Sequence, residues 1–516
     1  MHRTWRTDDK KIQTEESVRI DSESDERFLI EPEITESTKI DLIDLPALLR
    51  DMHRYSDFRL VLLDPDMLFE NYSFPNETYD NTIPNKIFTF GIFEKDGAKF
   101  EQFYKNYLST SGDRYRLITA RGIDFRQMRS KKSKSTYREI LTHYFLFIDP
   151  NLYKSSIILH LAVIFPRHNF FWISDLQESI FSSPEFRFLA HSKYAIPLPM
   201  AVESFECANY SFAIDYRAVA DRSINNPSND PIDGLINLCS SNDLDFYLWQ
   251  LPHSRLHECH FNDIVYPFRA RFSHMGQLDN ISAQAEALGE IMRISKRQRI
   301  PTSIISGTLL GWYRQCDYIV ESKDIDTYIM ADEYKYDFFR ELFGSPSLAL
   351  TLRLGTLDVG LEFRTYGRNK GVWLDVFLMY PQGKNQTCTY MWANRYWYQT
   401  SYPLRTGVCS AELFGVLTYI PCNYADYVKA DYGNDGWFAP NKGSTYANIN
   451  MKYITKFPET DEPFMHFRYA KGGCTQPDEL WGCDDMPVGA KNSYLYQQYM
   501  AKRQSTTKNW RITNHH

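Results

Sequence analysis

Two aspartates separated by a single residue, Asp324 and Asp326, are the first residues of this sequence whose types and spacing point to chemistry. They open an apolar run that ends at Met330 and is typical of a buried strand, in which residues i and i+2 point to the same face. Two adjacent carboxylates repel each other unless a cation lies between them, and hard oxygen ligands suit Mg²⁺ or Mn²⁺. The spacing therefore predicts a divalent-metal site, against the alternative of a solvated loop pair.

A third carboxylate, Asp375, stands in the middle of the apolar stretch from Val372 to Tyr380. A charge at such a position costs on the order of several kcal/mol unless it is paired or coordinated. If a neighbouring strand supplies it, Asp375 would complete a two-metal phosphoryl-transfer site with the first two aspartates. Glu362 is a candidate fourth carboxylate, because it is expected to face Asp375 across a hairpin.

A turn of small residues, Ser306-Gly307-Thr308, precedes the aspartates where a strand is expected to meet a helix. Backbone N–H groups and the helix dipole at such a junction can hold a phosphate. The order of a Gly-Thr turn, an Asp-x-Asp pair and a lone Asp inside an apolar strand is typical of nucleotidyltransferase-fold enzymes. This order predicts a catalytic site.

The elements that must position these residues follow from the apolar periodicity. Ile281, Ala285, Leu288 and Met292 lie at i, i+4, i+7 and i+11, one face of an amphipathic helix. After this helix we expect strands over 302–306 and 324–330, a helix over 309–315, and a hairpin of 358–366 with 372–380. This succession predicts an α+β domain with a mixed sheet.

The first half of the chain predicts a second, strand-rich domain. Short apolar runs between turn-rich spacers are expected to form its strands, at 58–65, 87–93, 144–148, 157–165 and 245–251. We therefore predict a flexible acidic leader at 1–50, a strand-rich stem domain at 51–272, a catalytic domain at 273–465 and a C-terminal extension at 466–516.

Composition excludes several classes of protein. Hydrophobic residues make up 43 % of the chain and aromatic residues 15 %, enough to bury sizeable cores, so global disorder is excluded. The net charge is −7, and nothing in the totals predicts binding to nucleic acid. The longest apolar run, 157–165, is shorter than the roughly 20 residues that a membrane span needs, so no transmembrane helix is predicted.

The stretch from Ile305 to Asp326 resembles the signature of the LicD/fukutin family. Further stretches support the resemblance, namely Val372–Leu378, Tyr419–Cys422, Tyr427–Gly433 and Trp437, with shorter matches in the first half at Leu62–Pro65 and Leu251–Cys259. Ser322 and Lys323 stand where the bacterial LicD proteins carry a further Asp, which favours the fukutin branch. The resemblance covers about residues 58–440.

The resemblance implies a fold and a reaction. The enzyme would have a nucleotidyltransferase-fold catalytic domain, and it would move a phosphorylated polyol, ribitol 5-phosphate in this branch, from a CDP-activated donor to the O-mannosyl glycan of a glycoprotein and release CMP. Asp324, Asp326 and Asp375 would be the catalytic residues and the ligands of Mg²⁺ or Mn²⁺. The resemblance implies five further residues at the donor phosphate, namely Ser306, Gly307 and Thr308 as its cradle and Arg314 and Lys323 as charge partners. It also implies the Golgi membrane or lumen, with other Golgi glycosyltransferases as possible partners.

Two rival functions stay open. One is a phosphocholine transferase that uses CDP-choline. The other is a non-catalytic scaffold for other glycosyltransferases, against which the intact aspartates count. The sequence also offers two other candidate sites: a structural zinc at His253, His257, Cys259 and His260, whose spacing fits no common zinc site, and an aromatic cluster at Trp392, Trp397 and Tyr398 that could stack a base or pack in a core.

Cysteines and glycosylation sequons bear on the compartment. The chain has nine cysteines without a C-x-x-C pair, whose pairing the sequence leaves open, Cys474 with Cys483 being one option. It also has five N-x-S/T sequons, at Asn71, Asn76, Asn209, Asn280 and Asn385. These features fit the Golgi lumen, and we expect an apolar anchor of about 20 residues upstream of Met1 in the native transcript.

Overall fold

A computed structural model provides the structure of the protein, and every structural statement below concerns the residues that it describes. These are 48–49, 51–52, 58–64, 85–110, 114–124, 138–148, 156–176, 196–203, 212–215, 235–239, 241, 243–259, 278–319, 322, 324–357, 360–368, 372–393, 396–413, 415–436, 451–456 and 466–468. The chain divides into residues 1–41, which lie outside these ranges, and a compact unit of residues 42–516. Most of the predicted leader and of the predicted C-terminal extension also lies outside them.

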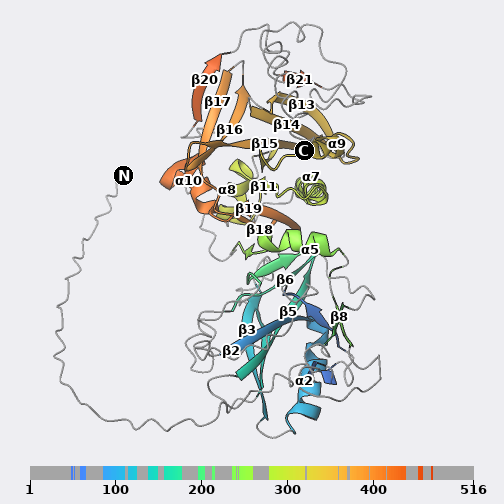
Figure 1. Ribbon diagram of the computed structural model, residues 1–516. Coiled ribbons are helices and arrows are strands. Elements are labelled where there is room, and N and C mark those ends of the chain that lie inside the picture. The colour runs from blue at the N-terminus through green and yellow to red at the C-terminus, as the bar shows by residue number, and fades with distance from the viewer. Residues whose placement is uncertain are drawn as a thin grey trace, which may run out of the picture. The chain divides into compact units, whose positions relative to one another are not determined.

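The first half of the described chain builds a mixed sheet in the order β1-β2-β5-β4-β3, with β6 paired to β5 and β7 (Figure 1). Its strands are β1 (Leu60–Leu62), β2 (Asn85–Phe93), β3 (Tyr115–Asp124), β4 (Arg138–Ile148), β5 (Ser156–Arg167), β6 (Phe170–Ile173) and β7 (Met200–Val202). Helix α2 (Gly97–Phe103) and the short helices η2 (Glu94–Asp96) and η3 (Tyr104–Leu108) follow β2, and β8 (Phe212–Asp215) pairs with β9 (Leu235–Leu238). The strands predicted from the first four apolar runs are confirmed as β1, β2, β4 and β5.

The strand predicted at 245–251 is wrong, because this segment forms helix α5 (Leu244–Gln250) followed by the short helix η7 (Leu251–His253). The side chain of Asp243 caps the helix by accepting a hydrogen bond of 2.8 Å from the Phe246 N–H. The buried side chains are Tyr247, Gln250, Leu251 and Ser254, at i, i+3, i+4 and i+7. This is helical spacing, and the aromatic content of the run concealed it.

The second half of the described chain builds a twelve-stranded sheet in the order β10-β18-β19-β11-β12-β15-β14-β13-β21, with β16 paired to β15 and β17, and β20 paired to β17 (Figure 1). Its strands are β10 (Leu256–His257), β11 (Ser303–Ile304), β12 (Asp324–Met330), β13 (Leu348–Thr356), β14 (Gly360–Gly367), β15 (Trp373–Gln382), β16 (Gln386–Ala393), β17 (Tyr396–Pro403), β18 (Val408–Leu413), β19 (Val416–Pro421), β20 (Met451–Lys456) and β21 (His466–Arg468). Parallel pairs, such as β12 with β15, occur beside antiparallel ones, such as β14 with β15. The predicted α+β class with a mixed sheet is confirmed.

Four helices accompany this sheet: α7 (Leu278–Arg297), α8 (Ser306–Gln315), α9 (Tyr336–Phe343) and α10 (Tyr424–Gly436). Helix α7 confirms the predicted amphipathic helix, and α8 packs against both β12 and α10. Strand β10 comes from the segment that the sequence places in the stem, yet it pairs with β18 of this sheet. Among the described residues, no helix is both long enough and apolar enough to cross a membrane.

Disulfides tie this half of the structure together. Cys259, just after β10, is bonded to Cys316 at the C-terminal cap of α8, and Cys409 of β18 is bonded to Cys422 just after β19. Because Cys259 is in a disulfide, it is not available as a zinc thiolate, and the zinc alternative is wrong for this residue. Cys388 is a free, buried thiol.

The disulfides predict an order of stability losses. Chain-entropy arguments give about 4 kcal/mol for the 57-residue separation of Cys259 and Cys316, and about 3 kcal/mol for the 13-residue separation of Cys409 and Cys422. We expect Cys259→Ser to lower the melting temperature more than Cys409→Ser, with Cys388→Ala as the free-thiol control. Thermal unfolding with thiol counting measures this, and reactive thiols at both Cys259 and Cys316 of the native protein would contradict it.

Candidate active site

The three predicted aspartates meet at the parallel pair of strands β12 and β15. Asp326 lies opposite Asp375 in the register, and Asp324 lies two residues earlier on the same face of β12. One carboxylate oxygen from each of the three lies within 4.8 Å of the others. The i, i+2 spacing and the apolar setting of Asp375 predict this convergence, and the structure brings the residues together.

The alternation along both strands explains why these acids face one side. Between them, Ile325 on β12 and Leu374 and Val376 on β15 are fully buried. Since successive strand residues point to opposite faces, burial of these apolar neighbours in the core directs the acids to the other face. The first turn of α8 packs on that face, and Asp431 of α10 lies close enough to raise the pKa of Asp326, so the carboxylates lie at a junction of sheet and helices.

The electrostatics of the acids favour a bound cation. Burial raises the pKa of Asp326 well above its usual value, and the nearby charges of Asp324 and Asp375 raise it further. Burial also raises the pKa of Asp375. A divalent cation would relieve this repulsion, and three carboxylate oxygens are the hard donors that Mg²⁺ and Mn²⁺ take. The residues present therefore fit the predicted metal.

A cation that the sequence reasoning missed, Arg364, lies against Asp375. Its Nε and Nη2 atoms donate hydrogen bonds of 2.7 and 2.6 Å to the two oxygens of Asp375. Asp375 is only 2 % exposed, so this bidentate pair supplies the charge partner that its burial requires. The pairing is also why the pKa of Asp375 is raised less than burial alone would raise it.

The register of the hairpin corrects the expectation for Glu362. Arg364 lies opposite Asp375, whereas Glu362 lies opposite Phe377, because the Gly367 N–H donates to the Val372 carbonyl and closes the loop there. Glu362 remains on the face of the acids and is buried, and burial followed by the charge of Asp375 raises its pKa well above the usual value. Its Oε2 atom has no hydrogen-bond partner among the described residues.

The start of α8 holds Asp326 in place. The Gly307 N–H donates to Asp326 Oδ2 at 3.2 Å, and Thr308 Oγ1 accepts from the Asp326 N–H at 2.9 Å. The helix begins at Ser306, earlier than predicted, so the expected Gly-Thr turn is its first helical turn. Ser306 has φ +51°, a conformation that non-glycine residues adopt at a cost and that concentrates at functional sites. The predicted phosphate role of these three residues stays a prediction.

A further acid, Asp431 of α10, was also missed. It is 1 % exposed, and the hydroxyl of Tyr402 donates to its Oδ1 at 2.8 Å. Burial raises the pKa of Asp431 to about 7, against the lowering effect of hydrogen bonds from Tyr402 and Ser306. The one signal in the sequence was its place inside the stretch Tyr427–Gly433 that supports the family resemblance.

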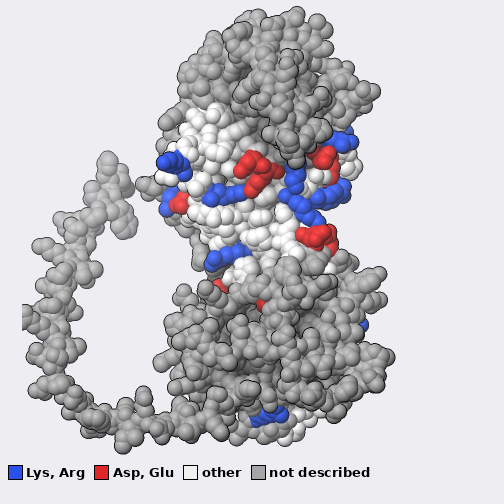
Figure 2. All heavy atoms as spheres, viewed as in Figure 1, with Lys and Arg blue, Asp and Glu red and all other residues white. Residues whose placement is uncertain are grey.

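Of the two predicted charge partners of the donor phosphate, Arg314 and Lys323, the structure describes Arg314. Arg314 is in the last turn of α8, about 12 Å along the helix axis from Ser306, and its guanidinium donates to Gln315 Oε1. Lys323 lies outside the described residues, as do the side chains of Trp392 and Trp397. Figure 2 shows acidic and basic side chains next to one another on the visible face of the part that holds the twelve-stranded sheet.

The amino-acid sequence of the chain is similar to those of several known proteins. No protein-family model matches the chain. The chain is similar to Ribitol-5-phosphate transferase FKTN of Mus musculus, with 29 % identity over 244 residues, and of Homo sapiens, with 30 % identity over 249 residues; each match covers 45 % of this chain and 50 % of the relative. An uncharacterised protein of Caenorhabditis elegans is 29 % identical over 159 residues, 29 % of this chain and 41 % of that protein. The chain thus spans about half the length of the relatives that it matches. These matches confirm the resemblance to fukutin that the motifs predict.

Proposed function

We propose that this chain is a metal-dependent phosphotransferase of the nucleotidyltransferase fold that moves ribitol 5-phosphate from CDP-ribitol to the O-mannosyl glycan of a glycoprotein. The observation that carries the proposal is the convergence of Asp324, Asp326 and Asp375 beside the first turn of α8. The similarity to proteins named ribitol-5-phosphate transferase supports the choice of ribitol phosphate.

The reaction assigns one task to each group. A hydroxyl of the acceptor attacks the phosphorus atom that carries ribitol. The bond between that phosphorus and the bridging oxygen of CMP breaks, and CMP leaves as an anion that keeps this oxygen. Asp324, Asp326 and Asp375 would hold the divalent cation. When bound, the cation offsets negative charge on the transferred and leaving phosphates. Arg364, whose side chain is 37 % exposed, adds a fixed positive charge at the same place.

The attacking hydroxyl must also lose a proton. Burial raises the pKa of Asp431 to about 7, near the pH at which a general base works best. The hydrogen bond from Tyr402 holds its carboxylate in one orientation. We assign the proton to Asp431, whose hydrogen bonds involve Tyr402 and Ser306.

A panel of CDP-alcohols tests the donor. We expect CMP release from CDP-ribitol in the presence of an O-mannosyl glycan acceptor and Mg²⁺ or Mn²⁺, and its loss in excess EDTA. Faster release from CDP-choline would favour the phosphocholine transferase. No CMP from any donor, with a folded protein and metal present, would favour the non-catalytic scaffold.

We also propose that the protein works in the Golgi lumen. The disulfides of Cys259 with Cys316 and of Cys409 with Cys422 support this, because such bonds persist in oxidising compartments. The exposed turn that carries the sequon residue Asn385, between β15 and β16, would leave room for a glycan there. The thiol counting described above tests the oxidised state directly.

A further inference from the structure

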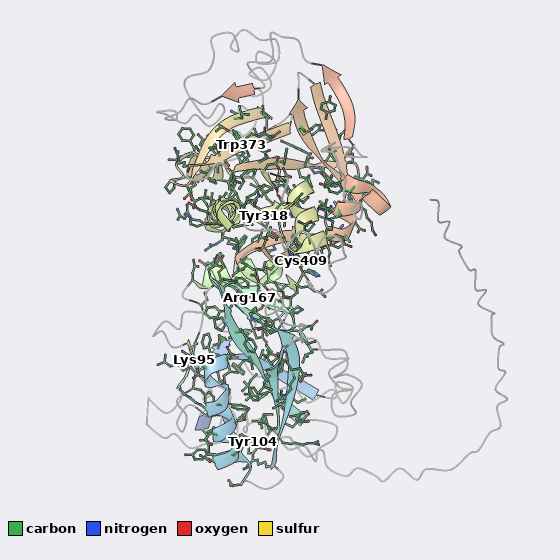
Figure 3. The ribbon with its side chains drawn as sticks, turned by 180° about the vertical axis from the view of Figure 1, so that it is seen from behind. Lys95, Tyr104, Arg167, Tyr318, Trp373 and Cys409 are labelled. Carbon is green, nitrogen blue, oxygen red and sulfur yellow. A yellow bond between two sulfur atoms is a disulfide. The ribbon has the colours of Figure 1, made fainter. Side chains whose placement is uncertain are left out.

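A pair of aromatic side chains, the exposed Trp373 and the half-buried Tyr366, lies near the carboxylates. Among the described residues, the exposed large apolar side chains are those of Tyr107, Leu357, Trp373 and Leu404. Within this group only Trp373, which is 38 % exposed, shares a strand with a carboxylate of the site, being two residues from Asp375 on β15 (Figure 3). Its indole contacts the ring of Tyr366 on β14, with ring centroids 4.7 Å apart and planes at 58°.

The strand register places this pair on the face of the acids. Tyr366, Trp373 and Asp324 form one row across β14, β15 and β12. The next row holds the guanidinium and the two facing carboxylates, in the order Arg364, Asp375 and Asp326. Neighbouring rows of the same face are two residues apart, about 7 Å along the strand. The aromatic pair is therefore one step from the proposed metal site.

At the opposite end of the same face, the side chains of Glu362 and Tyr328 are buried and that of Phe377, between them, is half-buried. The row beyond the acids holds Glu362, Phe377 and Tyr328, and Tyr328 is fully buried and stacked on the ring of Tyr427 from α10. A ligand whose phosphates reach the acids therefore extends along the sheet toward Trp373 rather than toward Tyr328. A ligand that covers the exposed indole buries apolar surface of both partners, and this burial favours binding.

We infer that Trp373, with Tyr366 beside it, is the stacking platform for the nucleobase of the nucleotide donor. The inference rests on the proposed function, since a nucleotide must first be held by its phosphates. The base is the part of such a donor that has a planar π-face, whereas the polyol is flexible and has none. In a nucleotide the ribose separates the base from the phosphate. The distance of about 7 Å between the row of Trp373 and the row of Asp375 leaves room for that ribose.

Binding of CMP to the metal-loaded protein tests the inference, because CMP carries the base but not the polyol. We expect Trp373→Ala to weaken CMP binding about 5- to 100-fold in isothermal titration calorimetry. Trp373→Phe, which keeps an aromatic face, should retain most of the affinity, and Tyr366→Ala should weaken binding less than Trp373→Ala. Tyr107→Ala, an exposed ring on η3 and 46 % exposed, is the matched control and should bind CMP as the native protein does.

The outcomes separate this inference from the proposed function. If the native protein binds CMP and Trp373→Ala binds it equally well, the platform is overturned while the proposed function stands. If Trp373→Ala leaves CMP binding unchanged but raises the KM for CDP-ribitol or for the acceptor, the indole contacts the polyol or the glycan and the inference is again wrong. A native protein that binds no cytidine nucleotide overturns both.

Discussion

Replacing Asp326 with asparagine is expected to lower the rate of CMP release by about 10³-fold or more while the fold is retained. Asp326 faces Asp375, adjoins Asp324 and accepts from the Gly307 N–H, so it is the most central of the three carboxylates. Asparagine has nearly the same shape and can still accept that hydrogen bond. It lacks the charge that holds a cation, and the loss is therefore expected in the reaction rather than in the structure.

Stability and metal binding provide the readouts beside activity. In EDTA, Asp326→Asn should melt at or above the temperature of the native protein, because it removes a buried carboxyl whose ionised form is disfavoured by burial and by repulsion from Asp324 and Asp375. Calorimetric binding of Mn²⁺ should be lost or strongly weakened. Asp337→Asn, an exposed carboxylate on α9, is the control and should change neither property. Activity within tenfold of the native enzyme for Asp326→Asn would remove Asp326 from the site.

Removal of Arg364 is expected to have the second large effect, this time on stability. Arg364→Met leaves Asp375 buried without its bidentate partner, and losing one member of a buried pair costs about 3–5 kcal/mol. The side chain of Arg364 is 37 % exposed, so water screens the pair and we expect about 2–3 kcal/mol, measured by urea unfolding in EDTA. Arg364→Lys keeps the charge but not the fork geometry, and should lose less.

A double variant tells a structural role of Asp375 from a role in metal binding. Arg364→Met combined with Asp375→Asn should regain most of the stability lost in Arg364→Met, because no uncompensated charge remains. Mn²⁺ should also stabilise Arg364→Met but not the double variant, since a bound cation can replace the guanidinium only if Asp375 is a ligand. Equal losses in Arg364→Met and in the double variant would show that the ion pair does not explain the stability of this region.

The convergence of the three aspartates could be predicted from local sequence patterns. The i, i+2 alternation placed Asp324 and Asp326 on one face without knowledge of the rest of the fold, and the cost of a charge in an apolar strand marked Asp375. The helix over 278–297 was predictable because its apolar positions repeat with helical spacing. The segment 245–251 was misread because a short apolar, aromatic run fits a strand and a helix equally well; burial at helical spacing and the cap by Asp243 both favour the helix.

The sequence by itself determined which side chains carry charge, which strand face each occupies, and the resemblance to fukutin. Only the tertiary structure decided which strands are neighbours and in what register. That register set Arg364, rather than Glu362, opposite Asp375 and put Trp373 in line with Asp324. It also brought Asp431 near the acids and joined Cys259 to Cys316. These contacts join residues that are far apart in the chain. Whether they form depends on the cost of closing the loops between them and on the packing of the whole core, and no local sequence pattern contains that information.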